Sequence, residues 1–159
     1  MLILTANLIN IALIVHIYGP MELTYFFSNW AVCVNCIFFG IAIAASKYQL
    51  NFSLLAWHHM LFELSLIMNF IVVTVFWSVL AEGAFKKYQG NFMKILNSYW
   101  THIVPALCVV INFTISDVTM KAKHGLVVPI PALMYGYVNY VETKARKAPI
   151  YWFLTWEDY

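Results

Sequence analysis

Residues 60–80 of the chain read MLFELSLIMNFIVVTVFWSVL and contain one charged side chain, Glu63. A helix rises about 1.5 Å per residue, so a helix of this length is about as long as the roughly 30 Å hydrocarbon core of a bilayer is thick. An apolar run of this kind leaves no polar face for water. The segment therefore predicts a membrane-spanning helix.

The composition of the whole chain agrees with this prediction. Of the 159 residues, 63% are hydrophobic and 10% are charged, and the mean hydropathy is +0.76. Soluble domains contain about 45–50% apolar and about 25% charged residues, so a water-soluble fold and intrinsic disorder are both excluded. The net charge is only +2, and no basic stretch is interleaved with exposed aromatic residues. We therefore expect no nucleic-acid partner.

Four more apolar segments, separated by turn residues and charges, accompany residues 60–80. We expect one all-α domain, residues 1–159, folded as an integral membrane bundle of about five transmembrane helices. The expected spans are residues 2–18, 29–45, 60–80, 99–115 and 126–141. The first has neither a basic leader nor a cleavage site, which favours an anchor that stays over a signal peptide. The tail, 143–159, holds an apolar run too short to cross and is expected to lie in the membrane interface.

The distribution of Lys and Arg bears on orientation. Six of the nine follow the first, third and fifth expected spans, and three lie on the other side. The positive-inside rule then places the N-terminus outside the cytosol or matrix. We expect membrane lipids as partners and no cofactor, and the host membrane stays open between endomembranes, the plasma membrane and the mitochondrial inner membrane.

Alternation of five spans brings two reactive side chains to one side of the membrane. Ser28 begins the second span and His102 lies near the start of the fourth, so they share one depth. A serine hydroxyl becomes a nucleophile when a base lies within hydrogen-bond reach. Asn35, two turns below Ser28, and Asn112, in the fourth span, are candidates for orienting the pair or binding an oxyanion. The alternative is structural, because Ser and His near helix ends commonly bond backbone or headgroups and Asn joins helices.

Glu63 is the most deeply placed charge. His59 lies four residues earlier on the same helical face, so the two can pair, or can supply two ligands to a metal. The sequence indicates no third ligand, because His124 falls in a basic loop that we expect to be solvated. We therefore predict a local pair and no metal.

Several short motifs follow one another in a distinctive order. They are Tyr25-Phe26-Phe27-Ser28-Asn29-Trp30, Cys36-Ile37-Phe38-Phe39-Gly40, Val73-Thr74-Val75-Phe76-Trp77, Asn97 with His102 and Pro105, and Pro149-Ile150-Tyr151-Trp152-Phe153-Leu154. The series spans most of the chain and resembles the androgen-induced-gene family, which includes the androgen-dependent TFPI-regulating protein.

The resemblance implies a multi-span membrane threonine hydrolase that cleaves fatty acid esters of hydroxy fatty acids. Alignment on the motifs places the family's threonine at Ser28 and its histidine at His102. The chain departs from the pattern in three ways. Serine stands for threonine, the chain stops where a sixth span is expected to begin, and the family is usually drawn with a cytosolic N-terminus.

Two functions follow from these observations. The first is an intramembrane lipid ester hydrolase that uses Ser28 and His102. The alternative is a non-catalytic structural or accessory subunit of a larger membrane complex, in which other subunits cover the face of the missing sixth span. A transporter or channel is less favoured, because Glu63 is the one ionisable residue placed deep in an expected span.

Overall fold

The computed structural model describes residues 2–48 and 52–156. All regular secondary structure within these residues is helical, which confirms the predicted all-α class. In chain order the elements are α1 (Leu2–Tyr18), α2 (Glu22–Tyr25), α3 (Phe27–Lys47), α4 (Phe52–Val75), η1 (Phe76–Leu80), α5 (Ala81–Lys87), α6 (Phe92–Ile115), η2 (Ala122–Val127) and α7 (Pro129–Arg146). Element η1 is a single π-helical turn between α4 and α5, and η2 is a short 3-10 helix.

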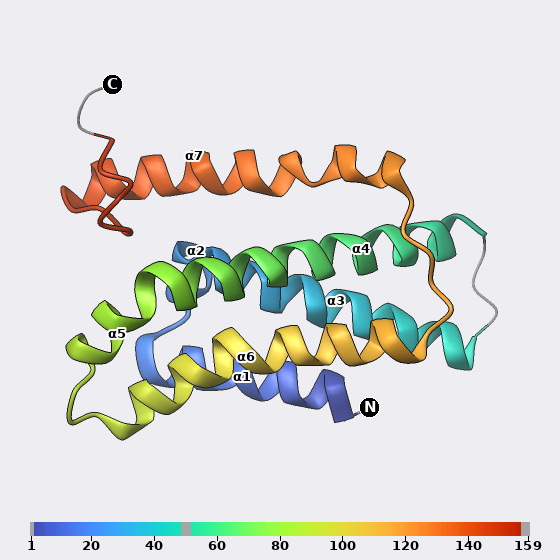
Figure 1. Cartoon of the computed structure of the whole chain (residues 1–159), viewed down its shortest axis with the longest axis horizontal. Coiled ribbons are helices and arrows are strands. Elements are labelled where there is room, and N and C mark those ends of the chain that lie inside the picture. Colours follow the sequence, from blue (N-terminus) through green and yellow to red (C-terminus); the bar gives the residue numbers. More distant parts are fainter. Residues whose placement is uncertain (1, 49–51, 157–159) are drawn as a thin grey trace.

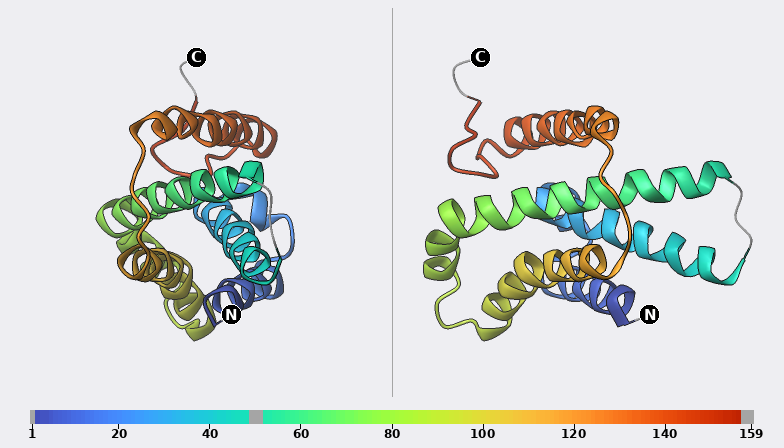
Figure 2. Two further views of the ribbon diagram at one scale, coloured as in Figure 1. Left: turned by 90° about the vertical axis from the view of Figure 1, so that its right-hand side faces the viewer. Right: turned by 45° about the vertical axis from the view of Figure 1, so that its right-hand side comes forward.

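Four helices form the body of the molecule. α1, α3, α4 and α6 pack side by side in a bundle, in which α1 contacts α3, α3 contacts α4, α4 contacts α6, and α6 returns to α1 (Figure 1). α7 lies along one side of this bundle. It is next to α4 in the view of Figure 1 but separate from it in both views of Figure 2. Its main contacts are with α2 and η2.

Three helical segments are long and apolar enough to cross a membrane. They are Phe27–Lys47, Phe52–Lys87 and Phe92–Ile115, which contain the second, third and fourth predicted spans. The third is longer than predicted, because α4, η1 and α5 form one continuous helical segment. Leu2–Tyr18 is apolar but shorter. The predicted fifth span overlaps the end of η2 and most of α7, whose last turns carry charged residues.

Local sequence signals explain where these helices begin and end. Gly19 and Gly90 have φ angles of +94° and +82°, a left-handed backbone that glycine adopts without a Cβ penalty. The Asn91 side chain accepts a hydrogen bond from Lys94 N at 3.1 Å and so caps the first turn of α6. Pro129 opens α7, at a position where a missing N–H costs no hydrogen bond.

The interior of the bundle is unusually polar at one level. Asn35, on α3, is fully buried and donates through Nδ2 to Asn7 Oδ1 of α1 at 3.4 Å and to Pro105 O of α6 at 3.2 Å. Its Oδ1 accepts from Ser65 Oγ and, at 2.9 Å, from Asn69 Nδ2, both on α4. One side-chain amide thus links all four helices of the bundle.

Apolar packing surrounds this polar level, and apolar side chains also cover the outside. Phe38, Phe62 and Val109, from α3, α4 and α6, are each at most 1% exposed and belong to one cluster. Phe70 on α4 and Leu133 on α7 are both 73% exposed. A large apolar side chain with that exposure is unfavourable in water and is ordinary where a helix faces lipid.

The C-terminal tail folds back on α7, and its position in the membrane interface stays a prediction. Residues 143–146 are the last turn of α7, and the chain then folds back so that Trp156 Nε1 donates to Asn139 Oδ1 at 2.8 Å. Lys144 Nζ donates to the Trp156 carbonyl at 2.6 Å, and this second hydrogen bond holds the returning tail against α7. Residues 157–159 of the predicted tail lie outside the described residues.

We predict that Asn35→Ala destabilises the protein by about 1–3 kcal/mol, because the substitution leaves several buried polar groups without partners in a medium that offers no replacement. Reversible unfolding in bicelles measures the change. Asn112→Ala is the matched control, since Asn112 has no side-chain hydrogen bond within the described residues, and it should shift the free energy of unfolding by less than about 0.5 kcal/mol. Equal effects of the two substitutions would contradict this role for Asn35.

Candidate functional site

A cavity of about 950 Å³ lies at the end of the bundle where α3 begins. Ser28 and His102, the two predicted catalytic residues, both line it. The rest of the wall comes from α1, α2, the end of α4, η1, α5, the first half of α6, α7 and the returning tail, and includes Val72, Val75 and Phe153. The sequence prediction that Ser28 and His102 lie at the same level is consistent with this arrangement.

Ser28 lies in the first turn of α3 and is 8% exposed. The helix begins there because Phe26 has extended backbone, with φ −112° and ψ 134°. The tail completes this helix start, since Phe27 N donates to the Tyr151 hydroxyl at 3.4 Å. Burial raises the pKa of the Tyr151 hydroxyl above its ordinary value, so this phenol stays protonated at neutral pH.

Two contacts hold the His102 ring, and the second of them defines which ring nitrogen is protonated. Its ring stacks on Phe76, with centroids 3.5 Å apart and an interplanar angle of 8°. Its Nδ1 lies 2.7 Å from the Ser98 carbonyl oxygen. Because a carbonyl oxygen can only accept, Nδ1 carries a hydrogen, and in the neutral imidazole Nε2 then presents a lone pair. A histidine in this state can accept a proton from a hydroxyl.

The π-helical turn η1 positions the ring on which His102 stacks. The Ala81 N–H donates to the Phe76 carbonyl five residues earlier, which widens the helix by one residue at this point. Such turns occur mostly as isolated insertions and are frequent at functional sites. In this chain the turn places Phe76, 4% exposed, against the imidazole.

Within the described residues, Ser28 and His102 share no hydrogen bond, and the two predicted helper residues lie elsewhere. Asn35 is not in the cavity wall, and its donors and acceptor are taken up by the four-helix contact described above. Asn112 lines a second cavity, of about 260 Å³, together with His58 and Ser116. Neither asparagine is therefore placed to bind an oxyanion at Ser28.

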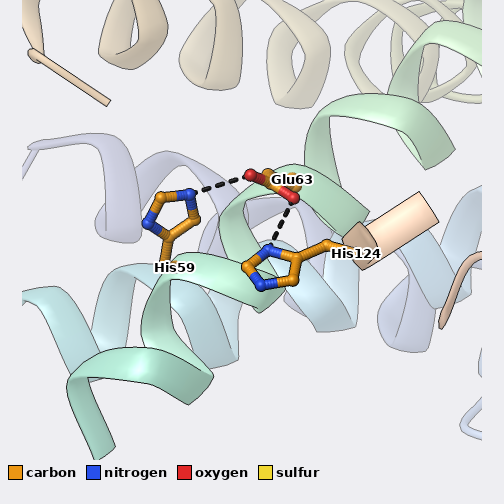
Figure 3. A group of neighbouring side chains, drawn as sticks. All are labelled: His59, Glu63 and His124. Carbon is orange, nitrogen blue, oxygen red and sulfur yellow. Dashed lines mark hydrogen bonds and ion pairs between the residues drawn. The ribbon is translucent and has the colours of Figure 1, made fainter. Parts of the chain in front are cut away.

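A second polar cluster lies toward the opposite end of the bundle, near the start of α4. Figure 3 shows the Glu63 carboxylate between the rings of His59 and His124. Glu63 Oε1 is 2.8 Å from His59 Nε2, and Oε2 is 2.8 Å from His124 Nδ1. The backbone N–H of Lys121 also donates to Oε1 at 2.8 Å. The predicted His59–Glu63 pair is confirmed, but it is part of a larger cluster.

The expectation that His124 is solvated was wrong. Its side chain is 17% exposed and contacts Glu63, a residue 61 positions away in the sequence. The connection between α6 and α7 crosses the end of α4 and carries η2 with it, and this crossing brings His124 to the carboxylate. The two lysines of this loop led to the prediction that His124 is exposed to solvent. No sequence signal indicated that the loop crosses the end of α4.

The contacts of the aromatic tail are a further feature that the sequence did not indicate. Tyr151 approaches Tyr135 of α7, with ring centroids 6.4 Å apart, and the Tyr135 hydroxyl donates to the Tyr25 carbonyl at 2.8 Å. The aromatic run itself was visible in the sequence. Its position as a wall of the Ser28 cavity depends on the reversal of the chain after α7.

Comparisons of the chain with models of protein families, with curated proteins and with solved structures found no match. The resemblance to the androgen-induced-gene family therefore stays a prediction that rests on its motifs.

We predict that Ser28 and His102 are reached from one side of the membrane and His124 from the other, because the two clusters lie toward opposite ends of the bundle. Single cysteines introduced as Ser28→Cys, His102→Cys or His124→Cys, in a chain whose native cysteines are replaced, test this with a membrane-impermeant thiol reagent on sealed vesicles. Labelling of positions 28 and 102 from different sides would be incompatible with a shared site.

Proposed function

We propose that the chain is an intramembrane lipid ester hydrolase, with Ser28 as nucleophile and His102 as general base. One observation carries the proposal: both residues line the same largely apolar cavity. The bond from Nδ1 to the Ser98 carbonyl supports it, because it leaves His102 Nε2 as the free acceptor. A nucleophile and a base within one cavity are the minimum set for acyl transfer.

The proposed reaction proceeds in two steps. Ser28 Oγ attacks the ester carbonyl carbon while His102 Nε2 takes the hydroxyl proton, and collapse of the tetrahedral intermediate breaks the C–O bond. The alcohol leaves with the proton from Nε2. Water then attacks the acyl-serine with His102 again as base, which releases the fatty acid and restores the free hydroxyl.

The oxyanion of the intermediate needs donors near Ser28. Asn35 is engaged in the bundle contact. Phe27 N donates to the Tyr151 hydroxyl, and Asn29 N donates to the Phe26 carbonyl. Among the described first-turn amides of α3, the backbone N–H of Ser28 itself is the remaining candidate. The N-terminus of a helix directs N–H groups and a partial positive charge at an anion. Ser28 lies within that turn, and its own position thus supplies both nucleophile and electrostatic stabilisation.

The cavity agrees with a lipid substrate. Its volume of about 950 Å³ is at the upper end of the range of about 300–1,000 Å³ for small-molecule sites. Ile71, Val79 and Leu154 are among the apolar side chains of its wall. We propose a fatty acid ester of a hydroxy fatty acid, whose two chains stay in hydrocarbon while the ester reaches Ser28, in a membrane crossed five times by the chain.

Substrate binding completes the catalytic geometry in this proposal. Ser28 and His102 have no direct hydrogen bond within the described residues, and such bonds are often long in the absence of substrate. The ester enters between them, and the stack of His102 on Phe76 keeps the imidazole in one orientation while it does so.

We predict that a fluorophosphonate probe labels Ser28 in native membranes. Ser28→Ala should abolish labelling, His102→Ala should slow it about 10²–10⁴-fold because base catalysis is lost, and Ser28→Thr should retain it. Ser78→Ala is the matched control, since Ser78 is an exposed serine whose hydroxyl donates to the Thr74 carbonyl. Gel fluorescence with mass spectrometry of the labelled peptide measures each outcome. Absence of labelling in native membranes would rule out the hydrolase.

An accessory subunit of a larger membrane complex is the second candidate, and the packing of α7 favours it. α7 contacts mainly α2 and η2, and Leu133, Met134 and Tyr137 on this helix are 73%, 57% and 70% exposed. Neighbouring subunits that cover this side would bury those side chains. Migration in a large assembly on native electrophoresis, lost in Leu133→Arg, together with absence of probe labelling, would favour this function over the hydrolase.

A further inference from the structure

We propose that His59, Glu63 and His124 bind a divalent transition metal ion of the zinc class. Each residue offers one ligand atom, and these atoms lie within 4.8 Å of one another. The site is distinct from the Ser28 cavity and does not depend on the proposed hydrolase activity.

The distances suit a zinc ion once the side chains move, because the carboxylate–histidine pairs must open slightly and ligand atoms up to 4.8 Å apart must come closer. Zn–N and Zn–O bonds of about 2.0–2.2 Å in a tetrahedron place ligand atoms roughly 3.3 Å apart. The two histidine–carboxylate distances are 2.8 Å, the length of hydrogen bonds that now occupy the centre of the cluster. Replacing the shared protons by a metal ion requires those pairs to separate by about half an ångström.

The kind of ligands selects the class of metal. Two imidazole nitrogens and one carboxylate form the set found at catalytic zinc sites, which keep a fourth position open. Calcium and magnesium prefer oxygen ligands throughout, so they fit this cluster poorly. His59 and Glu63 are one turn apart on α4, and His124 approaches from η2, so the ligands come from two elements that the ion would hold together.

The surroundings orient the carboxylate as an outer shell does in metal sites. Glu63 is 3% exposed, and the Lys121 N–H donates to its Oε1 at 2.8 Å. A buried carboxylate is costly without positive charge beside it. A metal ion supplies that charge directly, whereas the histidines supply it only when protonated. Hydrogen bonds of this kind to a ligating carboxylate fix its orientation and strengthen binding.

Space for a fourth ligand lies beside the cluster. His59 also lines the cavity of about 260 Å³, whose wall contains His58 Nε2 and Ser116 Oγ, two buried polar atoms that have no partner within the described part of the chain. Buried polar atoms are normally hydrogen-bonded, so two orphaned atoms at one cavity indicate water or a small ligand there. The carbonyl oxygen of Thr119, 3.1 Å from His59 Nε2, is a further oxygen at the site.

Zinc titration of the purified full chain tests the proposal, with a purification tag that contains no histidine and with the chain in detergent or nanodiscs. We expect one Zn²⁺ per chain by elemental analysis and by calorimetry, and a Co²⁺ derivative with the intense visible bands of a tetrahedral site. His59→Gln, Glu63→Gln and His124→Gln should each lower affinity by more than the roughly 10–100-fold that loss of an outer-shell partner costs. His58→Gln, which removes a neighbouring histidine outside the ligand set, should leave the stoichiometry at one.

Folding is checked separately so that a lost site is not confused with a lost structure. His124→Gln changes a residue of a short loop helix, and its circular dichroism spectrum should match that of the unsubstituted chain. Zn²⁺ should raise the unfolding temperature of the unsubstituted chain and not that of folded His124→Gln. Two results would overturn the proposal and leave the cluster as a set of hydrogen bonds between α4 and η2. They are failure of the unsubstituted chain to bind stoichiometric Zn²⁺, and binding of Zn²⁺ by all three glutamine variants as tightly as by the unsubstituted chain.

Discussion

The side-chain amide of Asn35 connects α1, α3, α4 and α6 through one set of hydrogen bonds at the centre of the bundle. An amide at the centre of an apolar bundle must bond to protein, because no water is there to replace a lost partner. Because all these bonds must form, the positions of the four helices along their axes are fixed relative to one another at the level of Asn35. Apolar residues such as Phe38 and Met68 then fill the space around it.

The two candidate sites lie toward the ends of the bundle, on either side of the Asn35 hydrogen bonds. At one end, the first turn of α3 and the π-helical turn η1 place Ser28 and His102 in the wall of one cavity. At the other, the connection from α6 to α7 brings His124 to Glu63. The proposed hydrolase and the proposed metal site make different demands on the bundle. The proposed hydrolase needs an apolar cavity, and the proposed metal site needs a buried carboxylate held by hydrogen bonds.

Much of the fold could be predicted because helix formation in an apolar chain is a local property. Residues 2–18 were expected as a helix and are one, and the other four expected segments fall within or overlap helices. Ser28 and His102 could be paired for a related reason, since the alternation of spans fixes which helix ends share a side. The sequence did not indicate that Asn112 lines a different cavity, because periodicity does not determine which neighbour a helix face meets. It did not indicate that Asn35 joins four helices, because a polar residue deep in a helix can serve catalysis or packing equally well.

The helical class, the apolar segments and the level of each polar residue along its helix can be read from the chain, because these depend on composition and on a rise of about 1.5 Å per residue. The contacts between side chains of different helices depend on how the helices pack. His124 joins Glu63 through a loop crossing, and Tyr151 reaches the start of α3 through a chain reversal. Both contacts join residues more than 60 positions apart. Contacts of that range depend on how whole helices pack, and no local pattern of residues encodes them.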